Sequence, residues 1–249
     1  ISTKESLEAS VVSAPCENDE RKAAVVDLFR KMGAAGSDIK IETFNKEKTS
    51  NVVVHLKGRS DETIIIGAHY DKTKLGCGVV DNWTGVSIIA HLYRSLSSIG
   101  TKRSYTFVAF DREEEGLIGS REMVKAMSKE QIAGTCAMAN FDSFGQTAPY
   151  IFRSVSSKGL SKHAKEVAKR SDLELLEVNI QNASTDSASF IKKKIPSIAF
   201  SGLGRDWDKI LHTKEDRFEK VNMDSVYLAY RFGLLFVIDL ETAACSDLR

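Results

Sequence analysis

Two hydrophobic periods alternate along the chain, and each change of period marks the boundary between a predicted strand and a predicted helix. Short runs of Ile, Val and Phe are typical of buried strands, whereas apolar residues that recur every three or four positions predict helices. We expect strands at residues 38–44, 51–58, 63–69, 104–110, 135–142, 173–178 and 196–200. We expect helices at residues 17–32, 82–96, 116–127, 157–171, 186–193 and 224–243, with Asn18 as the N-cap of the first.

The alternation of strands and helices predicts a mixed, mainly parallel sheet that is covered by helices on both faces. The strand at 63–69 is apolar at consecutive positions, as expected of a strand buried on both faces. The strand at 38–44 alternates between apolar and polar residues, which indicates a half-buried edge strand. A chain of 249 residues can form one large core. We therefore expect a single three-layer α/β/α domain over residues 1–249, without an accessory domain.

Composition and charge exclude some classes of partner. The formal net charge is +1 and no block of basic residues occurs, so the sequence gives no support for nucleic-acid binding. No apolar stretch approaches the length of a membrane span, because the longest run, at residues 234–240, is short and contains an acid. We therefore expect neither a nucleic-acid partner nor a transmembrane helix.

Four cysteines are scattered through the chain, at Cys16, Cys77, Cys136 and Cys245. They form no C-x-x-C pair, which argues against a cysteine-based zinc site. They can form disulfides in three connectivities or remain buried thiols, and the sequence does not choose between these states. We interpret Cys77 as a packed small residue and not as a metal ligand.

Residues that bind metals follow several of the buried strands directly. Ligands gather beyond the carboxyl ends of parallel strands, so these side chains are expected to converge. Two histidines with several carboxylates form the mixed nitrogen and oxygen set that suits zinc. The candidates are His69, Asp71, Asp81, Asp111, Glu113, Glu114, Asp142 and His212.

Each of these candidates also has a purely structural interpretation. Asp81 and Asn82 precede a predicted helix and are a candidate N-cap pair, while the acids of 111–115 and 212–216 are typical of solvated loops. The order in which the acids follow apolar strands favours a convergent site. The remaining histidines, His55, His91 and His163, lie within predicted strands or helices, and we interpret them as structural.

Five short motifs occur in an order that resembles a known family. They are GAHYD (67–71), DNWTG (81–85), EEEGLIGS (113–120), FD (141–142) and HTKED (212–216). On these motifs the chain resembles the co-catalytic di-zinc aminopeptidases, zinc exopeptidases of the bacterial leucyl aminopeptidase type. Glutaminyl cyclases and transferrin-receptor-like proteins are relatives of that family. The resemblance implies the zinc-exopeptidase, phosphorylase/hydrolase-like fold.

The resemblance also implies a set of metal ligands and a cofactor of two zinc ions per chain. His69 and Asp142 would complete one zinc site, and Glu114 and His212 would complete the other. Asp81 would bridge the two ions. Zinc ions that share a water in this way lower its pKa and polarise a peptide carbonyl.

Two further acids take catalytic roles by the same resemblance. Glu113 would be the general base, and Asp71 would fix the tautomer of His69 by binding its second ring nitrogen. In the family pattern Glu-Glu-x-Gly, Gly116 corresponds to the glycine. Glu113 and Glu114 are then the glutamate pair, and Glu115 is the x position. Glu115 is therefore expected to be exposed.

The chain departs from the family pattern at residues 184–190, STDSASF, where Ser187 occupies the position of a histidine in many relatives. That position is associated in the family with the shape of the substrate pocket, so the resemblance does not define a side-chain preference. We expect Arg205 and Trp207 to line the substrate pocket, because they lie in a Gly-containing loop shortly before His212.

The leading functional hypothesis is an aminopeptidase that hydrolyses the N-terminal bond of peptides with a free amino end. The main alternative is a glutaminyl cyclase, a single-zinc acyltransferase in which a Trp typically stands where this chain has Leu211. A third hypothesis is a catalytically inactive binding module, although all the expected ligands and the base are present. We expect a monomer, and the missing initiator Met together with the resemblance suggests a secreted or periplasmic protein.

Overall fold

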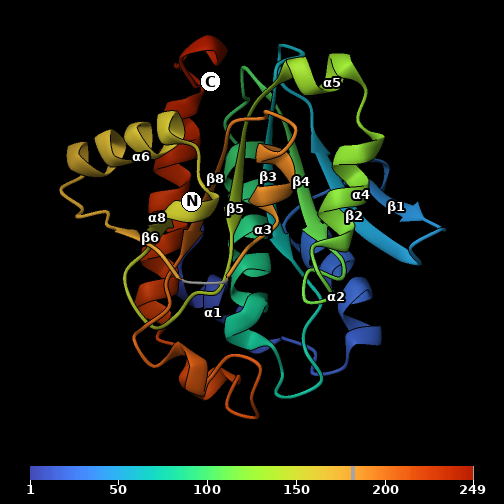
Figure 1. Cartoon of the computed structure of the whole chain (residues 1–249), viewed down its shortest axis with the longest axis vertical. Coiled ribbons are helices and arrows are strands. Elements are labelled where there is room, and N and C mark those ends of the chain that lie inside the picture. The colour runs from blue at the N-terminus through green and yellow to red at the C-terminus, as the bar shows by residue number, and fades with distance from the viewer. Residues whose placement is uncertain (181–182, 249) are drawn as a thin grey trace.

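A mixed sheet forms the middle layer of the computed structural model, which describes residues 1–180 and 183–248 (Figure 1). In the described residues its eight strands lie in the order β1-β2-β4-β3-β5-β8-β6-β7. They are β1 (Ile39–Phe44), β2 (Thr49–Leu56), β3 (Thr63–His69), β4 (Ser104–Phe110), β5 (Thr135–Phe141), β6 (Tyr150–Phe152), β7 (Glu177–Val178) and β8 (Ser197–Ser201).

The central strands β4, β3, β5 and β8 are parallel to one another. Antiparallel pairs flank them: β2 with β4, β1 with β2, and β6 with β8. In the register of this sheet, Gly67 of β3 lies opposite Val108 of β4 on one side and Asn140 of β5 on the other. The carboxyl ends of these three strands therefore meet at one edge. The mixed, mainly parallel sheet predicted from the sequence is confirmed, and β1 is an edge strand.

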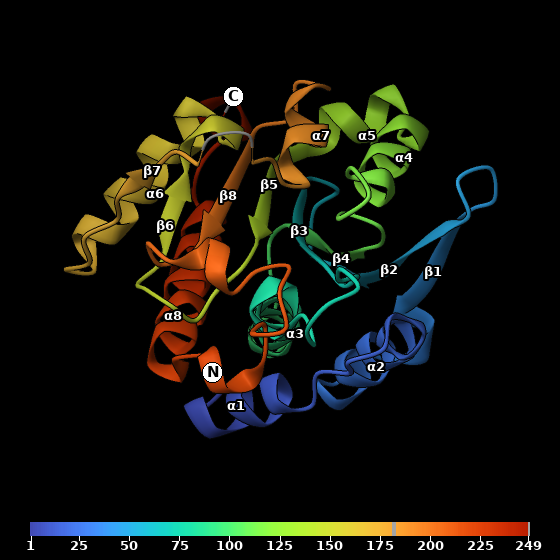
Figure 2. The same cartoon turned by 60° about the horizontal axis from the view of Figure 1, so that its bottom comes forward.

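Helices cover both faces of this sheet. They are α1 (Lys4–Val12), α2 (Asn18–Lys31), α3 (Thr84–Ser97), α4 (Ile118–Ala126), α5 (Lys129–Gly134), α6 (Lys158–Arg170), α7 (Ser187–Ile191) and α8 (Met223–Leu240). Figure 2 shows α4, α5 and α7 on one side of the sheet and α1, α2 and α3 on the other. Helices α6 and α8 pack against each other, and α8 packs on α3. The chain thus forms the expected three-layer α/β/α domain.

The three consecutive isoleucines of β3 divide between two hydrophobic cores. Ile64 and Ile66 belong to the large core beneath α3 and α8, and Ile65 belongs to the smaller core beneath α4 and α7. All three are at most 2% exposed. Because successive side chains of a strand point to opposite faces, a strand covered on both faces needs apolar residues at consecutive positions.

Short elements account for most of the differences from the predicted pattern. Helix α1, helix α5 and strand β6 were not predicted, and the strand expected at 173–178 is reduced to β7. In α1 the buried apolar residues are only Leu7 and Val11, too few to give a clear helical period. No helix within the described residues has the length and apolar content needed to cross a bilayer.

The predicted N-cap at Asn18 is wrong. Helix α2 has Glu17 at its N-cap position, and Asn18 instead uses its side chain to bind the backbone of Lys72. The side-chain nitrogen donates to the Lys72 carbonyl at 2.9 Å, and the side-chain oxygen accepts from the Lys72 N–H at 3.0 Å. Both backbone groups of one residue are satisfied, so the start of α2 is tied to the segment that follows β3.

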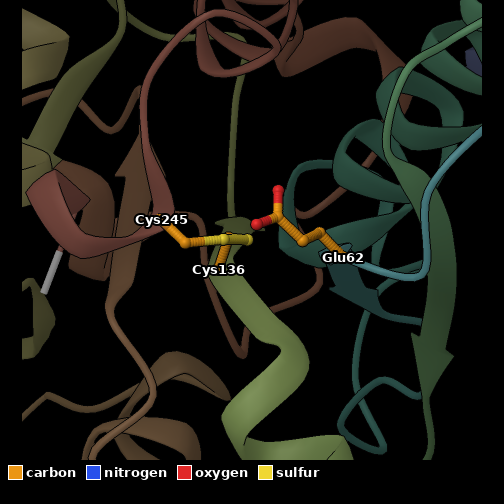
Figure 3. Close-up of side chains that lie close together, drawn as sticks. All are labelled: Glu62, Cys136 and Cys245. Carbon is orange, nitrogen blue, oxygen red and sulfur yellow. A yellow bond between two sulfur atoms is a disulfide. The ribbon is translucent and has the colours of Figure 1, made fainter.

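All four cysteines are paired in the structure, as Cys16–Cys77 and Cys136–Cys245. The interpretation of Cys77 as a simple packed residue is therefore wrong: it anchors the loop after β3 to the segment between α1 and α2. Figure 3 shows the second pair, with the Glu62 carboxylate beside the two sulfurs. Because both sulfurs are bonded to each other, these three residues do not form a thiolate metal site.

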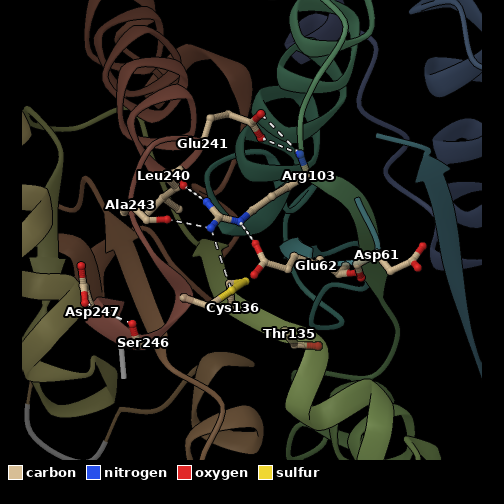
Figure 4. The surroundings of a disulfide bond; sticks show 12 residues. Asp61, Glu62, Arg103, Thr135, Cys136, Leu240, Glu241, Ala243, Ser246 and Asp247 are labelled. Atoms are coloured by element: carbon tan, nitrogen blue, oxygen red, sulfur yellow. Dashed lines mark hydrogen bonds and ion pairs between the residues drawn. A yellow bond between two sulfur atoms is a disulfide. The ribbon is translucent and has the colours of Figure 1, made fainter. Parts of the chain in front are cut away.

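Arg103 holds the chain segment that follows α8 (Figure 4). Its side chain is 1% exposed, donates to the carbonyl oxygens of Leu240 and Ala243, and pairs with Glu62 at 3.0 Å. The guanidinium therefore satisfies backbone carbonyls at the end of the last long helix beside the Cys136–Cys245 disulfide. This cluster stabilises the fold at the amino ends of the central strands, opposite to the end of the sheet where their carboxyl ends meet.

Replacement of Arg103 by Met should lower the free energy of unfolding by about 3 kcal/mol, because charged hydrogen bonds to otherwise unpaired backbone carbonyls are lost. Denaturant unfolding of the intact protein measures this change. Arg94→Met is the matched control, since Arg94 is exposed on α3. Equal unfolding midpoints for the two variants would contradict the assigned role.

Candidate metal centre and active site

Three strand ends deliver acids and a histidine to one edge of the sheet. His69 is the last residue of β3, Glu113 and Glu114 follow β4, and Asp142 follows β5. His69 lies opposite Phe110 of β4, and Asp142 donates its N–H to the carbonyl oxygen of Phe200. The parallel register therefore fixes these side chains beside one another, as the sequence predicted.

The Asp81 carboxylate lies between the two histidines. Its Oδ1 is 3.0 Å from His69 Nε2, and its Oδ2 is 3.2 Å from His212 Nε2. Each histidine has a second carboxylate of its own: Asp142 Oδ1 lies 3.5 Å from His69 Nε2, and Glu114 Oε2 lies 3.0 Å from His212 Nε2. The five residues expected to hold metal are thus arranged as two pairs on opposite oxygens of one shared carboxylate.

The N-cap interpretation of Asp81 is wrong, because its side chain faces the histidines and Trp83 occupies the N-cap position of α3. The neighbouring Asn82 connects α3 to the end of β5. Its side-chain oxygen accepts N–H groups from Gly85 and Ser143, and its side-chain nitrogen donates to the Phe141 carbonyl. Asp81 is therefore presented by a segment that is bonded to a neighbouring strand end.

The donor set fits a metal centre. Asp81 and Asp142 are 6% and 8% exposed, and Glu114 Oε1 is buried without a hydrogen-bond partner among the described residues. The ligand atoms of His69, Asp81 and Glu114 all lie within 4.8 Å of one another. Buried carboxylates are costly unless cations compensate them, and a mixed nitrogen and oxygen set is one that zinc accepts. These residues can hold metal ions at this edge of the sheet.

The electrostatics of these side chains follow from this crowding. Burial raises the pKa of Glu113 and of Glu114. Burial also opposes ionisation of Asp81, but the hydrogen bonds from His212 and His69 lower its pKa below the usual range. Hydrogen bonds to Asp81 and Glu114 raise the pKa of His212 to about 10. Metal ions and protons therefore compete for the same atoms.

Asp71 connects the histidine to the glutamates. Its Oδ1 lies 3.4 Å from His69 Nδ1 and accepts the N–H of Glu113 at 2.9 Å, while its Oδ2 accepts the N–H of Glu114 at 3.1 Å. Asp71 thus lies beside the second ring nitrogen of His69, and its backbone carbonyl oxygen is the nearer partner of that nitrogen, at 3.2 Å. The two backbone bonds were not expected from the sequence, and they fix the position of both glutamates relative to His69.

The triple glutamate is divided by a tight turn. Gly116 and Leu117 both donate their N–H groups to the Glu113 carbonyl and both have positive φ. Glu113 and Glu114 face the site, whereas the side chain of Glu115 is 59% exposed and pairs with Arg112 at 2.7 Å. The exposure predicted for Glu115 is confirmed.

Two buried residues that the sequence analysis did not select hold the loop between His69 and Asp81. Asp216 is 2% exposed, and its carboxylate accepts the N–H groups of Val80 at 2.7 Å and of Asp81 at 3.2 Å. Arg21 is fully buried and donates to the carbonyl oxygens of Cys77 and Gly78. Asp216 is the last residue of the HTKED motif, which was a usable signal; Arg21 lies on α2, where its sequence neighbours gave none.

A pocket of about 560 Å³ opens over these ligands. Its floor is polar and contains the paired histidines and carboxylates together with Glu113. Its wall is apolar and is formed by Phe152, Ile180, Leu203, Trp207 and Leu211. A polar floor beneath an apolar wall is the usual composition of a pocket that orients an organic ligand.

Of the residues discussed above for the substrate pocket, Trp207 lies in its lining and Arg205 and Ser187 do not. Trp207 lines it, whereas Arg205 lies in the lining of a neighbouring cavity. Ser187 is fully buried, donates to the carbonyl oxygen of Val155 at 2.7 Å and does not line the pocket. Thr185, two residues earlier, lines the pocket. Of the histidines interpreted as structural, His91 is buried and bonded to Ser10 at 2.9 Å.

Comparison with known proteins places these features in a family. The profile of peptidase family M28 matches residues 51–233, more than half of the chain. Aminopeptidase YwaD of Bacillus subtilis is 24% identical in an alignment of 221 positions that covers 84% of this chain and 47% of YwaD. The chain spans about half the length of the curated relatives it matches.

Two solved structures share the fold at lower identity. The LapA aminopeptidase of Legionella pneumophila superposes with a TM-score of 0.83 at 21% identity, over 97% of this chain and 72% of LapA. The glutaminyl cyclase of an Acidobacteriales bacterium also gives a TM-score of 0.83, at 17% identity, over 96% of this chain and 94% of the cyclase. The residues matched by the M28 profile, 51–233, include all five motifs on which the family resemblance was based. We conclude that the chain belongs to peptidase family M28.

Proposed function

We propose that this chain is a metal-dependent aminopeptidase that uses two zinc ions and removes the N-terminal residue of peptides. The observation that supports this proposal most strongly is the position of Asp81, whose two oxygens face different histidines at 3.0 and 3.2 Å. Each histidine has its own second carboxylate, so the donor set divides naturally into two sites. The similarity to YwaD, which is named as an aminopeptidase, is in accord with this activity.

His69 and Asp142 would hold one zinc ion, Glu114 and His212 the other, and Asp81 would contact both. Bound zinc supplies a Lewis acid that polarises the peptide carbonyl and lowers the pKa of a water. The residues of this chain then have to position the substrate and move the proton.

Glu113 is the residue best placed to move that proton. It lies in the floor of the pocket, and its carboxylate forms no hydrogen bond or ion pair within the part of the chain that the structure describes. Burial raises its pKa, which suits a group that accepts a proton from the attacking water and later gives it to the leaving amine. Asp71 holds the Glu113 N–H at 2.9 Å and thereby limits the movement of this base.

The pocket also matches the polarity of a peptide's amino end. The free amine is a cation and is attracted by the acidic floor, while the apolar wall formed by residues such as Phe152 and Leu211 accommodates an apolar side chain. We therefore propose peptides with a free N-terminus, and an apolar first residue, as the substrate class.

A glutaminyl cyclase is the second candidate function, because this chain spans nearly the whole length of the Acidobacteriales cyclase. Leu211 stands where cyclases typically have a Trp. This difference favours the peptidase.

We further propose an oxidising compartment outside the cytoplasm. The pairing of all four cysteines into two disulfides supports this location, because disulfides persist mainly where the surroundings are oxidising.

The metal content should distinguish the two candidate functions. Protein saturated with zinc and freed of excess metal should contain close to two equivalents by elemental analysis, and a chelator should abolish hydrolysis of an aminoacyl reporter until zinc is restored. A reproducible single equivalent, together with conversion of an N-terminal Gln peptide to its pyroglutamyl form, would support the cyclase instead.

The roles of the paired glutamates should separate by substitution. Glu113→Gln should retain both zinc ions and lower kcat by about 10²-fold or more, because the amide keeps the shape but cannot accept a proton. Glu114→Gln should weaken the binding of one zinc ion as well as the rate. Loss of metal in Glu113→Gln with full metal in Glu114→Gln would show that the two roles are reversed.

Asp71 should act on metal affinity through His69 and the backbone of the glutamates. Asp71→Asn should weaken zinc binding by roughly 10- to 100-fold in a competition titration against a chromogenic chelator. Asp61→Asn is the matched control, since its side chain is 99% exposed and pairs only with Lys57 among the described residues. Zinc affinities that are the same in both variants would contradict this role of Asp71.

A further inference from the structure

A second cavity adjoins the catalytic pocket and is larger, at about 900 Å³. It lies between three segments, at residues 147–150, 173–180 and 203–207. The apolar residues of its lining include Pro149, Tyr150, Leu173, Leu176, Val178 and Ile180. The cavity is at the upper end of the size range of ligand pockets in proteins, which is roughly 300–1,000 Å³.

The two cavities share a wall. Ile180, Leu203 and Trp207 line both the catalytic pocket and the larger cavity. The larger cavity therefore directly adjoins the site over His69 and His212.

The larger cavity also differs from the catalytic pocket in charge. Its described lining contains two charged residues, Glu174 and Arg205, which have opposite signs. Leu176, a large apolar residue in this lining, is 56% exposed. An exposed apolar side chain in a concave surface without net charge favours an apolar ligand over an ionic one.

We propose that this cavity binds the residues of the peptide that follow the scissile bond, and that it selects peptides in which those residues are apolar. The inference rests on the proposed aminopeptidase function. In that reaction the amino end of the substrate stops in the acidic pocket, so only the part of the peptide after the scissile bond extends out of it. The shared wall at Ile180, Leu203 and Trp207 leads that part into the larger cavity.

The test compares three substrates that share an N-terminal Leu. The first is a Leu reporter with a small chromophoric leaving group, which has no downstream residues. The other two are C-terminally amidated peptides, Leu-Leu-Val and Leu-Ser-Ser. For the zinc-loaded protein, kcat/KM should be about tenfold higher for Leu-Leu-Val than for Leu-Ser-Ser, because the apolar downstream side chains leave water.

Leu176→Ser should reduce this preference about threefold or more, since a large apolar contact in the cavity is lost. Leu235→Ser is the matched control, because Leu235 is a 44% exposed leucine on α8 that lines neither cavity. The control should keep the preference of the unaltered protein. The reporter provides the reference rate for each variant.

The outcomes separate the inference from the function on which it rests. The same preference for Leu-Leu-Val in all three proteins overturns the inference. An equal change of kcat/KM for the reporter and both peptides in Leu176→Ser also overturns it, because that result would assign the cavity to the N-terminal side chain. If the zinc-loaded, unaltered protein hydrolyses none of the three substrates, the proposed function is rejected, and the inference with it.

Discussion

The shared position of Asp81 is the constraint on which the rest of the site depends. One carboxylate has to face two histidines from different parts of the chain, with Oδ1 at 3.0 Å from His69 and Oδ2 at 3.2 Å from His212. Several other acids are buried around it, and that concentration of negative charge is costly without compensating cations. The fold therefore has to hold these groups together against their mutual repulsion, and the bound metal would then offset it.

Rigid elements and buried hydrogen bonds hold the groups in place. The parallel strands β3, β4 and β5 fix His69, the two glutamates and Asp142, because their register leaves little freedom at the strand ends. The segment after β3 has no such register. It is held instead by Arg21, by Asp216 and by the Cys16–Cys77 disulfide, which connect it to α2 and to the loop containing His212. Residues that are not themselves candidate ligands thus determine the geometry of the centre.

The sequence predicted the elements that obey a clear period and the motifs that follow them. Consecutive apolar positions such as Ile64–Ile66 place a strand between two covered faces, and the residue after such a strand lies at the ligand edge. Short elements such as α1 were missed, because two buried apolar residues do not define a helical period. The partners of Asn18 and Cys77 were also unpredictable, since both are long-range contacts that depend on the packing of α2 against the loop after β3.

The central claim is that Asp81 lies between two metal ions, and anomalous diffraction from crystals of the zinc-loaded protein tests it directly. Two zinc peaks are expected, one on the His69 and Asp142 side of Asp81 and one on the Glu114 and His212 side, roughly 3.5–4 Å apart. A single peak at full occupancy, or a second ion away from Asp81, would contradict it.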